Sequence, residues 1–157
     1  MSSYAGWAYS VLVATSGLLA YAAWTDLQEY KIRNDLVLAL ACLFILYAIL
    51  AVPWMDLKWD LAFAALMFVV LLVIFAAGWM GGGDAKMLGV AFLWTGLSGA
   101  LPFGFLLAIF SLLHSLAAKF DWVDSQQTKT GHRRIPFAPS VAGALIGVFI
   151  LRALRFS

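Results

Sequence analysis

Long runs of apolar residues constrain this chain more than any other feature. The runs over residues 7–25, 36–53 and 60–79 each approach the roughly 20 apolar residues that one membrane-spanning helix needs. Of the 157 residues, 64% are hydrophobic and 11% are charged, whereas a soluble domain carries about 25% charged residues. The composition therefore excludes a water-soluble domain and a disordered, collagen-like or disulfide-rich chain. We expect an all-α, polytopic membrane protein with a single transmembrane domain over residues 1–157.

The apolar stretch over residues 87–118 is too long for one crossing. As a straight helix it would extend about 48 Å, well beyond a bilayer core of about 30 Å. It contains four turn-forming residues: Gly96, Ser98, Gly99 and Pro102. We therefore expect a short helix over residues 87–98, a turn, and a second helix over residues 101–119.

A last apolar segment runs from Pro139 to Arg152 and completes about six expected transmembrane helices. Within it, Gly143 and Gly147 have the spacing typical of close helix packing in membranes. We interpret these two glycines as packing residues only.

Lys and Arg are distributed unevenly between the two ends of the expected helices. The connections after the first, third and fifth helices contain seven of them: Lys31, Arg33, Lys86, Lys119, Lys129, Arg133 and Arg134. The opposite side contains three: Lys58, Arg152 and Arg155. Because basic loops are retained in the cytoplasm, we expect the first set inside, with the polar stretch from Asp121 to Arg134, and both termini outside. No Lys or Arg precedes Lys31, unlike a secretory signal, so we expect residues 7–25 to be a retained helix.

Two acidic residues lie where a structural role explains them poorly. Asp26 ends the first apolar run, where a carboxylate meets the negative end of its own helix dipole. Asp84 opens a helix after three glycines. Each alone is also compatible with a solvated interfacial Asp or a helix cap. Five other acidic residues suit simpler roles: Asp56 and Asp60 in an outer loop, Asp121 and Asp124 in the inner loop, and Asp35 at a helix N-terminus.

The glycines Gly81, Gly82 and Gly83 exceed what a helix cap requires. Glycine permits positive φ and lets another backbone approach closely, so we expect this segment to accommodate an extended peptide beside Asp84. A phosphate-binding loop needs Gly-Lys followed by Ser or Thr, whereas this chain has Gly-Asp-Ala-Lys. Lys86 either steers charge at this site or only marks the inner side of the membrane.

In the expected topology, Asp26 and Asp84 lie at the same cytoplasmic membrane edge. Two carboxylates about 3 Å apart cannot both ionise, so such a pair shares one proton. The ionised member then activates a water while its partner acts as the acid. The sequence therefore predicts peptide hydrolysis by an aspartic pair.

These segments resemble the prepilin peptidases, the GxGD-type intramembrane aspartic proteases that cut the leader from type IV prepilins and pseudopilins at the cytoplasmic face. The resemblance rests on Asp26 with Lys31-Ile32-Arg33-Asn34, on Gly81-Gly82-Gly83-Asp84-Ala85-Lys86, and on Ile135-Pro136-Phe137-Ala138-Pro139. It is closest to the short members of Flp-type tight-adherence pilus systems.

The resemblance implies a multi-pass protein of the bacterial inner membrane whose partners are a prepilin and the lipid bilayer. It implies that Asp26 and Asp84 are the catalytic pair. It also implies six residues that shape the substrate site: Gly81, Gly82, Gly83, Lys86, Asn34 and Pro136. The family often has Ile-Pro-Asn where this chain has Arg33 in place of proline.

Longer members of the family carry an N-terminal methyltransferase region with paired Cys-x-x-Cys. This chain has one cysteine, Cys42, so we expect no methyltransferase region, no zinc or other metal, and no cofactor.

Parts of the sequence are also compatible with three other functions. A small membrane transporter or assembly factor would also use paired carboxylates, although here the acids lie at the membrane edge rather than mid-span. A serine protease would use Ser111 and His114, which share a helix face, but the chain lacks Gly-x-Ser-x-Gly. A metalloprotease needs His-Glu-x-x-His, and the second histidine, His132, is in a loop. Nucleic acid is not implied by the net charge of +2.

Overall fold

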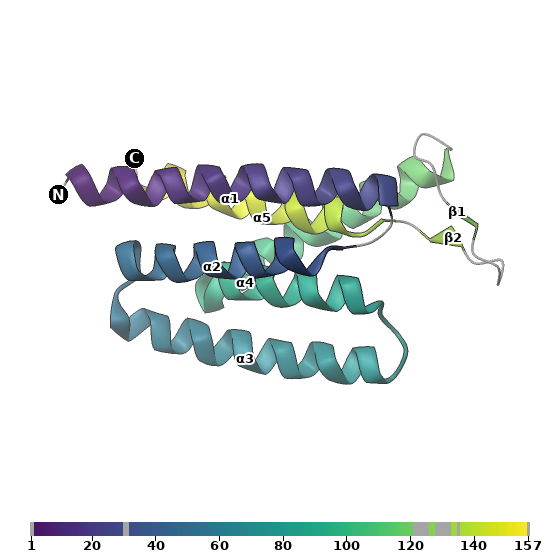
Figure 1. Ribbon diagram of the computed structural model, residues 1–157, viewed down its shortest axis with the longest axis horizontal. Helices are drawn as coiled ribbons and strands as arrows, with labels where there is room; N and C mark the ends of the chain where they lie inside the picture. Colours follow the sequence, from purple (N-terminus) through teal and green to yellow (C-terminus); the bar gives the residue numbers. More distant parts are fainter. Residues whose placement is uncertain (1, 30–31, 121–125, 128–132, 135, 157) are drawn as a thin grey trace.

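The computed structural model describes residues 2–29, 32–120, 126–127, 133–134 and 136–156. In these ranges it contains five helices and one pair of short antiparallel strands (Figure 1). The helices are α1 (Ser2–Glu29), α2 (Asn34–Ala51), α3 (Trp54–Ala76), α4 (Gly82–Lys119) and α5 (Ala138–Phe156). The strands are β1 (Gln126–Gln127) and β2 (Arg133–Arg134). Asp121, Asp124 and His132 lie outside the described residues.

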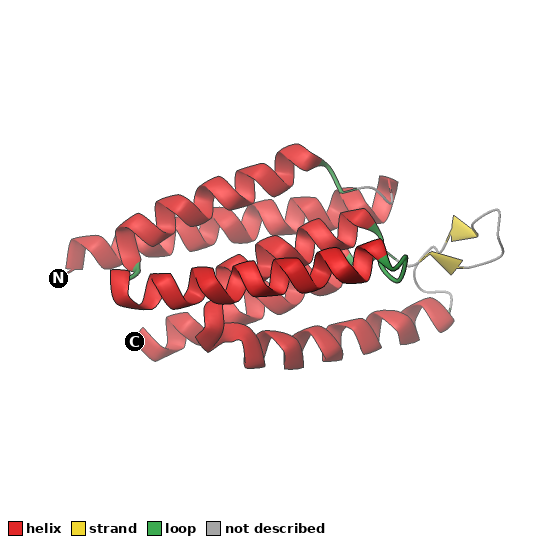
Figure 2. Cartoon of the chain, turned by 90° about the horizontal axis from the view of Figure 1, so that it is seen from below, coloured by secondary structure: helices red, strands yellow, loops and turns green. Residues whose placement is uncertain are grey.

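The helices form one elongated bundle, and the expectation of an all-α membrane protein is confirmed (Figure 2). Four helices, α1 to α4, are long and apolar enough to cross a membrane. Helix α5 contains a shorter apolar segment, Ala138–Leu154. Helices α1, α2 and α5 overlap their expected ranges and extend beyond them at one or both ends.

Helix α3 starts earlier than predicted. It begins at Trp54, whereas the apolar run placed its start at Asp60. Asp56 and Asp60 therefore lie inside the helix, and the prediction that they belong to a loop is wrong. The cause is the carbonyl of Pro53, which accepts the backbone N–H groups of both Asp56 and Leu57 and so starts the helix ahead of the apolar run.

Helix α3 also ends earlier than predicted, at Ala76. Gly78 has φ 76°, a left-handed conformation that glycine adopts readily. Its N–H donates to the carbonyl of Phe75, and the N–H of Trp79 donates to that of Ile74. These bonds satisfy the last carbonyls of the helix and stop it.

Helix α4 reverses direction at Gly96. A straight helix of its 38 residues would be about 57 Å long. Gly96, with φ 60° and ψ −172°, interrupts it, and the chain then turns back along the bundle (Figure 1). The first arm is residues 82–95 and the second arm is residues 97–119. The predicted reversal is confirmed, although Pro102 lies inside the second arm rather than in the turn.

Two charged side chains from other helices satisfy the backbone at this break. Asp60 on α3 accepts the N–H of Leu97 at 2.8 Å. Arg152 on α5 donates to the carbonyl of Trp94 at 2.9 Å and to that of Thr95. Helix ends leave unpaired N–H and C=O groups, and these are costly in an apolar environment. The opposite charges of Asp60 and Arg152 therefore cap the second and first arms respectively.

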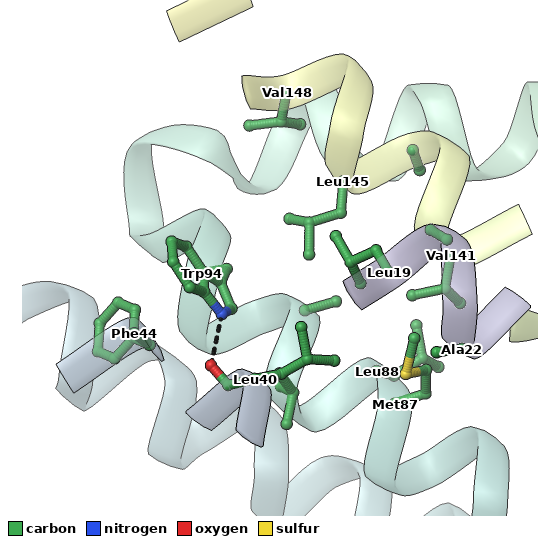
Figure 3. Close-up of a cluster of buried hydrophobic side chains, with 14 of the residues drawn as sticks. Leu19, Ala22, Leu40, Phe44, Met87, Leu88, Trp94, Val141, Leu145 and Val148 are labelled. Carbon is green, nitrogen blue, oxygen red and sulfur yellow. Dashed lines mark hydrogen bonds between the residues drawn. The ribbon is translucent and has the colours of Figure 1, made fainter. Parts of the chain in front are cut away.

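Helix α4 lies at the centre of the bundle, where it contacts α2, α3 and α5. Figure 3 shows the core that results, with Leu40, Trp94 and Leu145 converging from three helices. The indole N–H of Trp94 donates to the backbone carbonyl of Leu40 at 3.0 Å. Most of α3 faces outward, as expected for a helix in contact with lipid.

The glycine pair of α5 packs against the second arm of α4. A Cβ at Gly147 would lie 2.8 Å from a methyl carbon of Leu106, and one at Gly143 would lie 3.2 Å from the ring of Phe110. The interpretation of these glycines as packing residues is confirmed.

The two ends of the bundle differ. The N- and C-termini lie together at one end (Figure 1). At the other end α1 terminates, α2 and α5 begin, and α4 both begins and ends. We name this second end the site end, because it carries Asp26 and Asp84.

Candidate active site

Asp26 is buried in the last turns of α1, with 5% of its surface exposed. Its carboxylate oxygen Oδ2 accepts the backbone N–H of Ala138 at 3.0 Å. Ala138 is the first residue of α5, so the carboxylate lies at the positive end of that helix dipole. The adverse placement of Asp26 at the negative end of α1 is thereby offset by a helix that lies 112 residues away in sequence.

The segment before α5 delivers this N–H group. Pro136 is buried and precedes the helix. The carbonyl of Phe137 accepts the N–H groups of Ser140 and Val141, which starts the first turn. Pro139 has no N–H, so this first turn has one fewer donor to satisfy. Pro136, predicted to shape the site, thus belongs to the turn that places α5 against Asp26.

Asp84 is half-buried and lies within the first turn of α4. The N–H of Ala85 bonds to the carbonyl of Gly81 at 3.0 Å, and the helix begins at Gly82. Asp84 therefore lies inside the helix, and the alternative interpretation of Asp84 as the capping residue before the helix is wrong. A carboxylate in the first turn still interacts favourably with the helix dipole.

The three glycines allow close contacts within the protein itself. A Cβ at Gly81 would lie 3.1 Å from Oδ2 of Asp84, and one at Gly82 would lie 3.2 Å from the ring of Phe75. Among the described glycines, positive φ occurs at Gly78 and Gly96. Glycine is therefore favoured at these positions because it has no side chain, and not because positive φ is required. The absence of a Cβ at Gly81 leaves room for the Asp84 carboxylate.

Two contacts tie the segment after α1 to the start of α4. Ile32 lies against Gly83, 3.6 Å from where a Cβ would be. The ammonium of Lys86 donates to Oδ1 of Asn34 at 2.9 Å. These contacts bring six of the predicted site residues to the same end of the bundle as Asp26: Asn34, Gly81, Gly82, Gly83, Asp84 and Lys86. Lys86 therefore has a definite structural partner.

Arg33 keeps the backbone shape that a proline would impose. Its φ of −75° lies in the range that the proline ring fixes, and its ψ of 136° is extended. Its guanidinium pairs with Asp35 at 2.6 Å, and this hydrogen bond, with the charge of Asp35, raises the pKa of Arg33. Arg33 therefore has a backbone conformation that proline could also adopt.

The two carboxylates have unlike surroundings. Asp26 is buried and bonded to the start of α5, whereas Asp84 is half-buried and lies over Gly81. A pair of carboxyl groups in different environments can divide the roles of acid and base. Among the described residues, no group of three or more His, Cys, Asp and Glu side chains is arranged to hold a metal ion.

Sequence reasoning missed the environment of His114. Its Nδ1 lies 3.4 Å from the hydroxyl of Ser140 on α5, while the expected helix-face partner was Ser111. The hydroxyl of Ser115 bonds to the backbone carbonyl of Ser111. No local pattern signals a contact between residues on two different helices.

Comparison with known proteins adds one finding. The model of the type IV leader peptidase family matches residues 13–116, well over half of the chain. The matched range includes Asp26, the glycine segment, Asp84 and Lys86, and it ends before α5. No curated protein and no solved structure matches the chain significantly.

Proposed function

Because the chain belongs to the type IV leader peptidase family, we propose that it is an aspartic endopeptidase whose catalytic pair is Asp26 and Asp84. Family membership makes the protein a peptidase of the prepilin peptidase kind and confirms the resemblance found in the sequence. The match favours a peptidase over a transporter or an assembly factor.

The observation that carries the proposal is the position of Asp26. A buried carboxylate at the end of one helix, bonded to the first N–H of another, is held in one orientation. The contacts of Ile32 and Lys86 bring the start of α4, with Asp84, to the same end of the bundle. Groups held in this way suit catalysis because little reorganisation is needed during reaction.

The proposed reaction uses one ionised and one protonated carboxyl group. The ionised carboxylate takes a proton from water, and the water oxygen attacks the carbonyl carbon of the scissile peptide bond. The protonated partner gives its proton to the amide nitrogen as the carbon–nitrogen bond breaks. No metal or cofactor takes part in this scheme.

We further propose that the substrate is a Flp-like type IV prepilin or pseudopilin, cut at the cytoplasmic membrane edge. A site at the ends of helices cannot reach a peptide bond in mid-bilayer, so the cleavage site must lie just before an apolar helix. A prepilin with a short basic leader and a following apolar helix has this arrangement.

This placement is tested by moving the leader junction. The wild-type substrate is expected to be cut at its junction in liposomes that contain the purified protein, as measured by mass spectrometry of the products. Moving the junction four residues into the apolar helix displaces it by about 6 Å, and cleavage should fall about 100-fold or more. A substrate with four residues added at the free end of the leader is the control. Unchanged cleavage of the shifted substrate would place the site elsewhere.

The membrane arrangement that we propose has six crossings, with α4 crossing twice, the site end in the cytoplasm and both termini outside. The first arm is short, about 21 Å, and the two charged caps at the Gly96 break satisfy the backbone groups where the chain reverses to cross again. The excess of Lys and Arg in the connections at the site end supports this orientation.

Cysteine labelling tests the orientation. In a Cys42→Ala background, which removes the free cysteine on the exposed surface of α2, Gln127→Cys should react with an impermeant maleimide only from the cytoplasmic side. Asp56→Cys, at the opposite end of the bundle in the first turn of α3, should react only from outside. Labelling of position 127 from outside the cell would overturn this topology.

A further inference from the structure

His114 is an ionisable residue within the second arm of α4, inside a segment apolar enough to span a membrane. Its Nδ1 faces the hydroxyl of Ser140. Its Nε2 is fully buried and has no hydrogen-bond partner among the described residues. A buried polar atom without a partner destabilises a folded protein, and ionisable residues inside membrane segments usually serve a function.

The surroundings of His114 connect it to Asp26. The imidazole lines a pocket of about 350 Å³ together with Leu27, which follows Asp26, and with Pro139 and Ser140, which follow Ala138. Ala138 is the residue whose N–H bonds to the Asp26 carboxylate. Helices α1, α4 and α5 thus place the histidine in the same pocket as residues that adjoin Asp26 and its hydrogen-bond donor Ala138.

We propose that His114 is a positioning residue for Asp26, to whose carboxylate its Nε2 supplies a hydrogen bond, directly or through one water, while the peptide bond is cleaved. This inference rests on the proposed function. A carboxylate has about four acceptor positions, and the bond from Ala138 takes one of them. Because Nδ1 contacts Ser140, Nε2 is the ring nitrogen that has no partner among the described residues. His114 acts through Asp26 and does not itself touch the scissile bond.

Three substitutions distinguish the roles of Nε2, of Nδ1 and of the space that the imidazole fills. His114→Gln places an amide group near the position of Nε2, His114→Asn places one near Nδ1, and His114→Leu fills the space without polar atoms. His114→Leu removes the unpartnered Nε2 and also the contact of Nδ1 with Ser140, so cleavage by every variant is expressed per folded molecule. A purely structural role therefore predicts wild-type cleavage per folded molecule for His114→Leu.

The expected results differ between the variants. In proteoliposomes with a prepilin substrate, His114→Leu and His114→Asn should lower kcat by about 10- to 100-fold, the worth of a hydrogen bond to a charged group. Their KM should not change, since the substrate is still bound. His114→Gln should recover most of the wild-type kcat. Ser115→Ala, the next residue on the same arm, whose hydroxyl bonds only to its own helix backbone among the described contacts, is the control and should leave both constants unchanged.

Three outcomes would overturn the inference. These are wild-type kcat for His114→Leu, equal kcat for the Gln and Asn variants, and a rise in KM with kcat unchanged, which would indicate direct contact with substrate. If the His114→Leu protein does not insert into the membrane, the comparison of kcat between His114→Gln and His114→Asn still tests the inference. Asp26→Asn is measured in the same assay. Cleavage by Asp26→Asn would contradict the proposed function, whereas an inactive Asp26→Asn beside a fully active His114→Leu would contradict only the role of His114.

Discussion

Asp26→Asn and Asp84→Asn are each expected to abolish prepilin cleavage, with a fall in rate of about 10⁴-fold, as for loss of one member of a catalytic unit. Asn cannot take a proton from water or donate one as a carboxylic acid does. It keeps the volume of Asp, and at position 26 its side-chain oxygen can still accept the N–H of Ala138. Folding should therefore survive both changes, at a cost of about 1 kcal/mol from the lost interaction of charge with the helix dipole.

A matched control is available at the same end of the bundle. Asp35→Asn removes an exposed carboxylate that is paired with Arg33. Its cleavage rate should equal that of the wild type. If Asp35→Asn lost as much activity as Asp26→Asn and Asp84→Asn, the effect would come from the loss of any negative charge at this end of the bundle. It would then not identify Asp26 and Asp84 as catalytic.

Gly96→Ala is expected to have the largest effect on stability. Gly96 has φ 60°, a conformation that strains any residue with a side chain, and its Cβ would collide with the carboxyl group of Asp60. Strain and overpacking together should cost about 3 kcal/mol or more. Thermal unfolding in detergent, followed by the fluorescence of the tryptophans, should show a clearly lowered Tm.

Gly104→Ala is the matched control on the second arm. A Cβ there would meet nothing within 4 Å, so this substitution in a helix should be neutral or should stabilise by about 0.5–1 kcal/mol. Equal Tm values for Gly96→Ala and Gly104→Ala would contradict the described break.

Arg152→Met should lower the free energy of unfolding by about 2 kcal/mol, because it leaves the carbonyls of Trp94 and Thr95 without their donor.

Much of the fold could be predicted from the sequence because each membrane span is one long, continuous apolar segment. Apolar runs locate the helices, and the excessive length of the run over residues 87–118 forces a reversal near Gly96. The boundary errors at α3 have a local cause, since the carbonyl of Pro53 and the left-handed Gly78 set the ends of the helix independently of its hydropathy.

The candidate site could be predicted only in part. Asp26 and Asp84 stand out because each lies beside a helix end in a chain with few charges. The bond from Ala138 to Asp26 and the contact between Ser140 and His114 join residues that are 112 and 26 positions apart. The charged caps at the Gly96 break are also remote in sequence: Asp60 lies 37 positions from Leu97, and Arg152 lies 58 positions from Trp94. Such pairs depend on how the helices pack, and no local pattern encodes them.

The most direct test of the catalytic pair compares the double variant, Asp26→Asn with Asp84→Asn, against the two single variants in the same proteoliposomes. If the two aspartates act as one unit, each single variant has already lost the whole catalytic contribution. The double variant should then cleave prepilin no more slowly than either single variant, all three at the background rate. Substantial cleavage by a properly inserted Asp84→Asn protein, with a further fall in the double variant, would show that the two residues do not form a catalytic pair.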